Sequence, residues 1–355
     1  MNSFFSSTQY KNWIKTEDQL AKLETLKFSK ILKRINIVNE IIKIENIKLI
    51  EQHNADKNNQ SSPPPKLEQY ISTKRAFSLT DEKFLIISYS NKIIQMMNTQ
   101  KHKSSSLKNL TITYFRRFYL KKSILDYDPD FLMPAALYLA AKISSINYSR
   151  DDFIKIFSLL KSDENWEKLY NYEFYLCTIL DYEFFVYNPY QALLGFIYSL
   201  EQKEFFLAQD KDNYIDQEDF KNECMNLIDK MYLTDNIFLF TYSEIALASI
   251  IIQCEQKNVN IFNIAEKLGL DKAINIKEFL EIKVSLMKKK ISEIPKVSIK
   301  EGNEKSKHIL KNINRFLNDF PKYQAELNKE RKELKGKMNN FEINFAKFEP
   351  KIQKK

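Results

Sequence analysis

The scarcity of glycine and proline constrains the fold of this chain more than any other feature of its sequence. Only 4 glycines and 9 prolines occur among 355 residues. A sheet-rich fold with many tight turns normally needs more of both, because these residues supply the backbone angles that turns require. The composition therefore predicts an all-α protein, and the length suits one large domain or two modest ones.

Apolar residues recur at helical spacing in two successive blocks that together run from about residue 78 to about residue 294. Each block predicts five helices, and in both the third helix is rich in small residues, which is typical of a helix at the centre of a bundle. Asp128-Pro129 and Asn188-Pro189 are start signals for helices, and Thr241 with Glu244 predicts a capping box.

The two ends of the chain differ from these blocks. Thr16 is the expected cap of an N-terminal helix, and Trp13 just ahead of it is predicted to anchor that helix. The stretch 52–66 is polar, contains three successive prolines and predicts a linker or exposed loop. The predicted organisation is an N-terminal helix and extension (1–50), a linker (51–77), a first block (78–186), a second block (187–294) and a helical tail (295–355).

Positive charge is concentrated at the C-terminal end. The chain carries a net charge of +9, yet the region from Lys283 onward holds 20 Lys and Arg against 9 Asp and Glu, so the preceding residues are close to neutral. Such a run is compatible with a solvated helix face or a disordered arm. It is also compatible with contact to an acidic partner or to nucleic acid.

The segment TYFRRFYLKKS (113–123) combines aromatic rings with basic side chains, as nucleic-acid surfaces do. On a helix, however, its rings fall within one arc of roughly 200°, and Arg116 and Arg117 flank that arc. Base stacking requires exposed rings beside the cations. The projection instead predicts a buried aromatic face, so we expect no direct sequence-specific binding of nucleic acid by this segment.

The sequence contains none of the common catalytic signatures. It has no GxxxxGK[ST], GxGxxG or HExxH motif, and four glycines cannot build a phosphate-binding loop. Three isolated cysteines and three scattered histidines indicate neither a zinc site nor a disulfide framework. We expect no metal, no cofactor, no membrane span and no secretion signal. The chain is predicted to act by binding, as a non-catalytic scaffold in a reducing compartment.

The tandem helical blocks resemble the two cyclin boxes of the cyclin family. YFRRFYLKKSILDYDPDFLMPAALYLAAKI is similar to helices two and three of a first box. LYNYEFYLCTILDYEFFVYNPYQALLGFIYSL resembles helix five, the junction and the first helix of a second box. Within the family the likeness is to transcription-type cyclins, above all to the cyclin H group, and it covers most of residues 8–292. It implies tandem five-helix boxes with accessory helices at both ends.

The resemblance also implies a kinase-binding site. In cyclins, a lysine ending the third helix and a glutamate early in the fifth hydrogen-bond backbone groups of the kinase, and the matching residues are Lys142 and Glu173. Such groups at the rim of an apolar groove satisfy polar atoms that docking would otherwise bury unpaired. The apolar neighbours expected to complete the contact are Phe174, Tyr175, Leu85 and Tyr89.

Two departures from the family pattern indicate which branch of the family the chain resembles. Arg116 occupies the position where cell-cycle cyclins keep an aspartate, beside Arg117, so the buried Arg–Asp pair of those cyclins cannot form. The arginine-containing motif used to dock substrates is also missing from 81–97. In addition, Ser144 and Ser145 stand where the family usually has acidic residues. The first two features favour a transcription-type cyclin.

The resemblance therefore predicts a nuclear regulatory subunit that activates a cyclin-dependent kinase of the CDK-activating type. That kinase would phosphorylate other kinases' activation loops and the RNA polymerase II C-terminal domain. A RING-finger assembly factor and the TFIIH core are the further partners it implies. Two alternatives remain open: another transcription cyclin, of the C or T/K type, and a TFIIB-like DNA-binding factor. The second lacks support, because no CxxC of a zinc ribbon is present and the body of the chain is nearly neutral.

Overall fold

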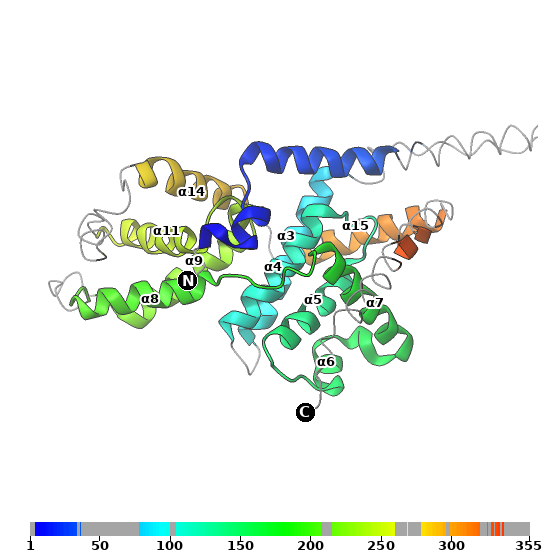
Figure 1. The fold of residues 1–355 in the computed structure, drawn as a ribbon, viewed down its shortest axis with the longest axis horizontal. Coiled ribbons are helices and arrows are strands. Elements are labelled where there is room, and N and C mark those ends of the chain that lie inside the picture. Colours follow the sequence, from blue (N-terminus) through cyan, green and yellow to red (C-terminus); the bar gives the residue numbers. More distant parts are fainter. Residues whose placement is uncertain are drawn as a thin grey trace, which may run out of the picture. The chain divides into compact units, whose positions relative to one another are not determined.

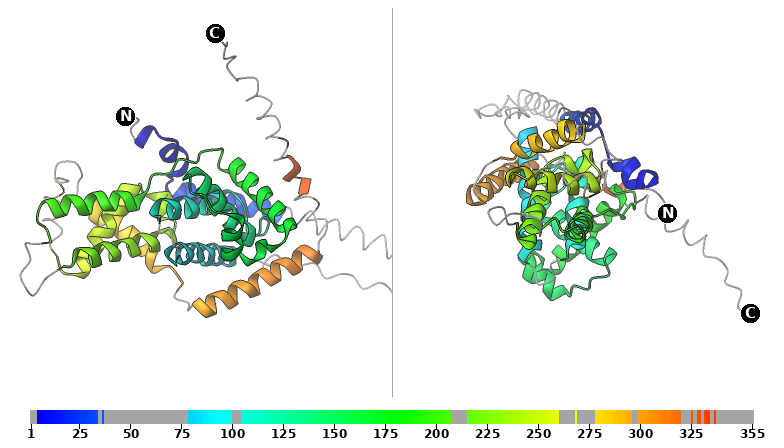
Figure 2. Two further views of the ribbon diagram at one scale, coloured as in Figure 1. Left: turned by 90° about the horizontal axis from the view of Figure 1, so that it is seen from below. Right: turned by 90° about the vertical axis from the view of Figure 1, so that its left-hand side faces the viewer.

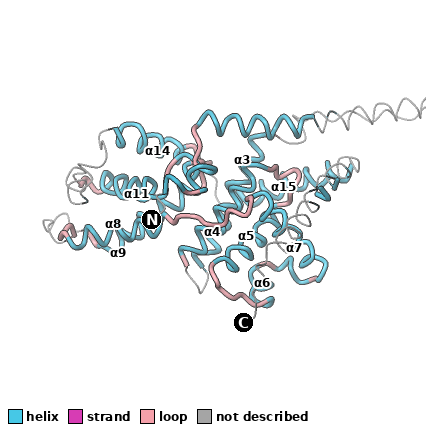
Figure 3. The backbone as a smooth tube through the Cα atoms, in the orientation of Figure 1, coloured by secondary structure: helices cyan, strands magenta, loops and turns pink. Residues whose placement is uncertain are grey.

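The computed structural model describes residues 4–33, 78–99, 104–206, 215–259, 278–295 and 299–319, together with residues 36, 268, 325, 328–329, 331–333 and 336. In these ranges the chain forms helices joined by short loops, with no strand (Figure 3), so the all-α prediction is confirmed. The predicted linker 51–77, the short helix expected near 260–270 and most of the tail beyond 319 lie outside the described residues.

The helices of the first block follow the predicted order (Figure 1). They are α3 (Leu79–Thr99), α4 (Ser105–Lys121), α5 (Pro129–Ile143), α6 (Arg150–Ile156), the 3-10 turn η3 (Ser158–Lys161) and α7 (Asp163–Ile179). Asp128-Pro129 starts α5 as expected, and a Ser149–Asp152 capping box starts α6. Small buried residues of α5, among them Ala136 and Ala140, let α7 pack closely against it.

The second block begins at Asn188, whose side chain caps α8. Its described helices are α8 (Pro189–Gln202), α9 (Gln217–Tyr232), the single turn α10 (Asn236–Leu239), α11 (Tyr242–Gln256), the π-helical η5 (Phe279–Val284) and α14 (Ser285–Ser292). The predicted Thr241–Glu244 capping box is present at the start of α11. Helices α8, α9 and α11 lie side by side (Figure 2), with α11 contacting both others.

The chain divides into two compact units. One comprises Met1–Leu20, Ile86–Tyr119 and Pro129–Val297, and so holds most of both blocks. The other comprises Ala21–Leu85, Leu120–Asp128 and Ser298–Lys355. The boundary between the two blocks at 186/187 therefore falls within one unit and stays a prediction.

The second unit brings together described residues from both ends of the chain and the start of α3. The carboxylate of Glu82 is buried: Oε2 lies 3.2 Å from Lys27 Nζ, and Oε1 accepts a hydrogen bond from the backbone N–H of Ile124. Helix α15 (Ile299–Asp319) buries Ile309 and Ile313, and Lys305 Nζ lies 4.3 Å from the centre of the Phe84 ring. The accessory helices at 17–33 and 299–319 are thus present as predicted.

Helix α4 is the most deeply buried of the described helices. Every residue from Leu107 to Tyr119 is buried, including the rings of the segment 113–123. The prediction of a buried aromatic face is confirmed. Arg116 and Arg117, which the helical projection places outside the aromatic arc, are buried as well. A helix surrounded on all sides has no exposed flank, and its charged residues must find partners inside the protein.

Candidate partner-binding surface

The end of α5 and the middle of α7 bring together the two residues that the sequence singled out. Lys142 lies in the last turn of α5 and Glu173 in the middle of α7, and Lys142 Nζ is 2.8 Å and 3.0 Å from the two carboxylate oxygens of Glu173. The Lys142 side chain is 52% exposed, whereas that of Glu173 is 14% exposed. The lysine thus remains accessible while the carboxylate holds it in place.

The surroundings of this pair keep the lysine charged. Partial burial favours the neutral amine, but the hydrogen bond and negative charge of Glu173 outweigh it and raise the pKa of Lys142. The ammonium group also lies 4.2 Å from the centre of the Tyr138 ring, a cation–π distance. Burial, together with the nearby Glu173 carboxylate, raises the pKa of the Cys177 thiol to about 12, so this cysteine is held as an unreactive thiol.

The predicted apolar neighbours of the pair are placed differently from one another. Phe174 is half-buried on α7, and its ring lies 5.8 Å from that of Tyr175. Tyr175, Leu85 and Tyr89 are all buried, and the Tyr89 hydroxyl donates to Asp130 Oδ1 at 2.6 Å. Because they are already covered by the chain's own side chains, these three offer no surface to a partner as the chain stands.

Two exposed apolar residues beside the pair were missed at the sequence level. Ile143 follows Lys142 directly, and Tyr170 lies one turn before Glu173 on α7, where it is 50% exposed and packs near the rings of Tyr138 and Trp166. The three-residue spacing of Tyr170 and Glu173 could have indicated Tyr170, since residues three apart share a helix face. The surface that Lys142, Glu173, Ile143, Tyr170 and Phe174 form is called the α5–α7 surface below.

A second group of polar residues joins the two blocks within the same unit and has no such exposure. From α4, Lys108 Nζ is 2.8 Å from Asp229 Oδ1 on α9, and the Tyr190 hydroxyl donates to the same oxygen at 2.5 Å. Arg116 donates to the backbone carbonyls of Leu233 and Thr234, which follow the end of α9. These contacts of α4 with the second block are called the inter-block seam.

Arg116 also has a charged partner in the seam. Arg116 Nη2 is 2.9 Å from Asp235 Oδ1, so the buried arginine forms an ion pair with an aspartate of the second block whose side chain is 41% exposed. Cationic side chains suit this place, because carbonyl groups at the end of a helix carry partial negative charge. The use of Arg116 as a marker of the family branch stays a prediction.

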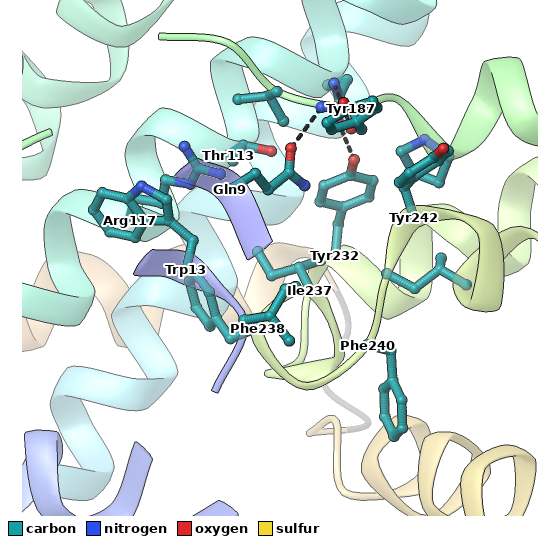
Figure 4. Close-up of a pocket in the computed structure, with 15 residues that line it drawn as sticks. Gln9, Trp13, Thr113, Arg117, Tyr187, Tyr232, Ile237, Phe238, Phe240 and Tyr242 are labelled. Carbon is teal, nitrogen blue, oxygen red and sulfur yellow. Dashed lines mark hydrogen bonds between the residues drawn. The ribbon is translucent and has the colours of Figure 1, made fainter. Parts of the chain in front are cut away.

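The N-terminal segment closes the seam around a small cavity (Figure 4). Trp13 is buried, its ring lies 4.5 Å from the Arg117 guanidinium carbon, and its Nε1 donates to Glu183 Oε2 at 2.7 Å. The Gln9 side chain accepts from the backbone N–H of Tyr187 at 2.6 Å. The cavity of about 20 Å³ is large enough for a single water. It is therefore part of the packing where the two blocks join. Trp13 thus packs into the joint between the blocks, with the start of the helix at 17–33 three residues behind it.

Other classes of site find no support in the part of the chain that the structure describes. No cluster of three or more His, Cys, Asp or Glu side chains is arranged to hold a metal ion among these residues. The search of the described helices found none that is both long and apolar enough to cross a membrane.

Comparison with known proteins finds sequences and structures that are similar to parts of this chain. Residues 188–318 match the family pattern described as the cyclin C-terminal domain. The chain is 26% identical over 253 residues to Cyclin CCL1 of Saccharomyces cerevisiae, covering 70% of this chain and 57% of that protein. It is 26% identical over 190 residues to Cyclin-H of Xenopus laevis, covering 52% and 57%. It is 32% identical over 165 residues to Cyclin-C1-1 of Oryza sativa, covering 45% and 58%.

Each of these matches spans less than two thirds of the relative's own length. Among solved structures, the chain is similar to one from the CAK complex of Chaetomium thermophilum bound to ATP-gamma-S, with a TM-score of 0.61, 19% identity and coverage of 88% of both chains. It is also similar to one from the yeast TFIIK (Kin28/Ccl1/Tfb3) complex, with a TM-score of 0.56, 20% identity and coverage of 81% and 100%. At these identities the structural likeness establishes the shared fold.

Proposed function

We propose that this chain, whose residues 188–318 match the cyclin C-terminal domain, is a transcription-type cyclin that binds and activates a cyclin-dependent serine/threonine kinase. Within that class we propose the cyclin H type, the regulatory subunit of a CDK-activating kinase. The kinase would act on the activation loops of other kinases and on the C-terminal domain of RNA polymerase II. The chain itself would supply binding and no catalytic group.

The observation that carries this proposal is the meeting of Lys142 and Glu173 on the α5–α7 surface. An exposed ammonium held by a partly buried carboxylate is a pre-positioned donor, because Glu173 occupies only part of its bonding capacity. A kinase helix docking on Ile143, Tyr170 and Phe174 would bury backbone carbonyl groups near its end. Lys142 would satisfy those carbonyls, and Glu173 would accept from backbone N–H groups.

Docking in this way would act on the kinase by holding its C-helix inward. In protein kinases a glutamate of that helix pairs with the lysine that contacts the ATP phosphates, and both must be in place for phosphoryl transfer. A cyclin that binds only the inward position shifts the kinase towards its active state by its differential affinity for that state. The proposed contribution of this chain is therefore to complete a site that lies on its partner.

The relatives support the class of partner and leave the subtype open. One structural relative comes from a complex named Kin28/Ccl1/Tfb3, and Ccl1 is also a curated relative. By analogy we propose a kinase subunit and a third, RING-finger assembly subunit for this chain, in the nucleus and linked to TFIIH. A cyclin-C relative of 32% identity favours a second candidate, a cyclin of the C type, which would pair with a Mediator-type kinase.

A pull-down with the full chain tests the proposal and separates the two subtypes. The chain would be mixed with a kinase of the CDK-activating class or with one of the Mediator class, and both binding and phosphorylation of a peptide from the polymerase C-terminal domain would be measured. The cyclin H type predicts binding and activation of the first kinase. Selective activation of the second would assign the C type, and binding of neither would overturn the proposed function.

The double variant Lys142→Ala/Glu173→Ala tests the α5–α7 surface itself. We expect at least a tenfold loss of kinase affinity, because several buried backbone groups of the kinase lose their partners. The matched control is Lys168→Ala/Glu164→Ala, which removes a lysine–glutamate pair of the same helix at 2.7 Å, exposed to solvent. Equal affinity for the double variant and the wild type would show that the interface lies elsewhere.

A further inference from the structure

We infer that the outward face of α8 is a docking surface for a basic amphipathic helix of a partner protein. The face comprises Gln191, Leu194, Gly195, Tyr198 and Glu201, all of them exposed. Gln191, Leu194, Tyr198 and Glu201 follow one another at intervals of three, four and three residues, the spacing with which one helix packs along another. The five residues are called the α8 stripe below.

The apolar members of the stripe are large and lie together. Tyr198 is 63% exposed and Leu194 is 43% exposed, one turn apart on the same side of the helix. The opposite side of α8 already buries Leu193, Ile197 and Leu200, and α8 packs there on α9 and α11. The exposed pair is therefore surplus to what the helix needs for packing in its own unit. Single exposed apolar residues are ordinary, whereas adjacent ones in a stripe mark a contact surface.

Gly195 within the stripe points to close approach by another backbone. Glycine in the interior of a helix destabilises it relative to alanine. A Cβ atom added at Gly195 would meet no atom within 4 Å, so nothing in the described part of the chain requires a glycine here. Gly302 on α15 has equally open surroundings, but no large apolar residue is exposed among the described side chains of that helix. At Gly195, between Leu194 and Tyr198, the helix carries no side chain, and this position is called the flat place below.

Acidic residues near the C-terminal end of α8 favour a basic partner helix. The described residues 201–206 and 215–219, which include the last turn of α8 and the first turn of α9, contain five Asp and Glu and one Lys, in a chain whose net charge is +9. All five acidic residues are exposed, namely Glu201, Glu204, Asp216, Glu218 and Asp219. A helix with lysine or arginine beside its apolar stripe would place its charges at this acidic end while its apolar residues cover Leu194 and Tyr198.

Two synthetic helical peptides of 21 residues provide the test. The basic probe carries leucines at alternating three- and four-residue spacing flanked by lysines, and the acidic probe has glutamate at each lysine position. Fluorescence anisotropy with the full chain would measure both affinities. We expect the basic probe to bind at least tenfold more tightly than the acidic probe, although the chain as a whole is positively charged. Equal or reversed affinities would overturn the inference.

Variants of the α8 stripe distinguish docking on this face from nonspecific electrostatic attraction between the probe and the chain. Gly195→Gln fills the flat place with a side chain that favours helix, so we expect basic-probe affinity to fall at least tenfold while the thermal midpoint of the chain stays equal or rises. Leu194→Ser/Tyr198→Ser should weaken binding similarly. The matched controls are Gly302→Gln on α15 and Ile282→Ser, another exposed apolar residue, and both should bind the probe as the wild type does.

Self-association of the chain through the α8 stripe is measured in a separate experiment. Sedimentation of the wild type without peptide would reveal a dimer if a second copy of the chain covered the stripe. A dimer that Tyr198→Ser dissolves would overturn the assignment to a basic partner helix. Basic-probe binding that is unchanged in the Gly195→Gln and Leu194→Ser/Tyr198→Ser variants would do the same.

Discussion

Two lysine–carboxylate pairs of equal length serve different ends in this protein. Lys108 and Asp229 lie 2.8 Å apart in the inter-block seam, where their side chains are 11% and 12% exposed. Lys142 and Glu173 are also 2.8 Å apart, but Lys142 is 52% exposed on the α5–α7 surface. The first pair has its remaining polar neighbours inside the chain, namely Tyr190 and Asn98. The second pair leaves the Lys142 ammonium accessible to solvent.

The comparison teaches that the distance between two charges does not indicate their role. Removing one partner of a buried pair leaves an uncompensated charge in a poorly solvated place. Removing Glu173 from the second pair leaves the exposed Lys142 ammonium, which water can solvate, so stability changes little. The seam pair should therefore govern the stability of the joint between the blocks, and the surface pair should govern binding.

The largest expected effect is that of Asp229→Ala. Lys108 and the Tyr190 hydroxyl would lose their shared acceptor inside the seam, and we expect a loss of about 3–5 kcal/mol in the free energy of unfolding. Urea denaturation of the full chain followed by circular dichroism measures it. The double variant Lys108→Met/Asp229→Leu removes both charges and should recover most of the loss. A cost below about 1 kcal/mol for Asp229→Ala would mean that the seam pair behaves like a surface pair.

Arg116→Met comes next. The carbonyls of Leu233 and Thr234 and the carboxylate of Asp235 would lose a charged donor, and we expect a loss of about 2–3 kcal/mol. Arg116→Lys should restore only part of it, because a single ammonium cannot reproduce the planar fork of guanidinium donors. Thermal and urea midpoints of the three proteins give the comparison. Full rescue by lysine would show that charge alone, and not the fork geometry, matters at this position.

Alkaline pH should destabilise the fold through buried tyrosines on α4, α8 and α9. Burial raises the pKa of the Tyr114, Tyr190 and Tyr232 hydroxyls above their ordinary value of 10. Below pH 10 these tyrosines are neutral in both the folded and the unfolded chain. Above it only the unfolded chain releases their protons, so the free energy of unfolding falls as the pH rises. Absorbance at 295 nm should show part of the tyrosine titrating only together with the loss of helical circular dichroism. Independent, gradual titration of all tyrosines would contradict this.

The smallest effect on stability is expected for Glu173→Ala. Since the charge that remains, Lys142, is 52% exposed and water can solvate it, the free energy of unfolding should change by no more than about 1 kcal/mol, whereas kinase affinity should fall at least several-fold. Urea denaturation and a kinase-binding titration on the same preparation separate the two quantities. A stability loss as large as that of Asp229→Ala would remove the distinction between the two pairs.

Much of the helical framework was predictable from local signals. The starts of α5, α8 and α11 follow from Asp128-Pro129, Asn188-Pro189 and the Thr241–Glu244 box, because caps and first-turn prolines act within a few residues. Lys142 and Glu173 were located by family resemblance, and the structure brings them together. Since they are 31 residues apart and lie on different helices, helical periodicity could not have predicted that they meet.

Burial, by contrast, was predicted less well. Leu85, Tyr89 and Tyr175 were expected on the docking surface and lie in the interior, and Arg116 and Arg117, expected beside the aromatic face, are buried too. Helical projection shows which residues share a side of a helix. It does not show how many sides are covered, which depends on elements that are distant along the chain.

The sequence by itself determined the all-α class and the succession of helices, because composition, caps and periodic apolar residues are local properties, and it carried the resemblance to the cyclin family. Only the tertiary structure decided that α4 is enclosed on every side, that its cations meet the end of α9, and that Lys142 stays exposed where Lys108 does not. The reason is physical: whether a charge is solvated, paired or left for a partner depends on what packs around it. Residues far away in the chain supply that packing.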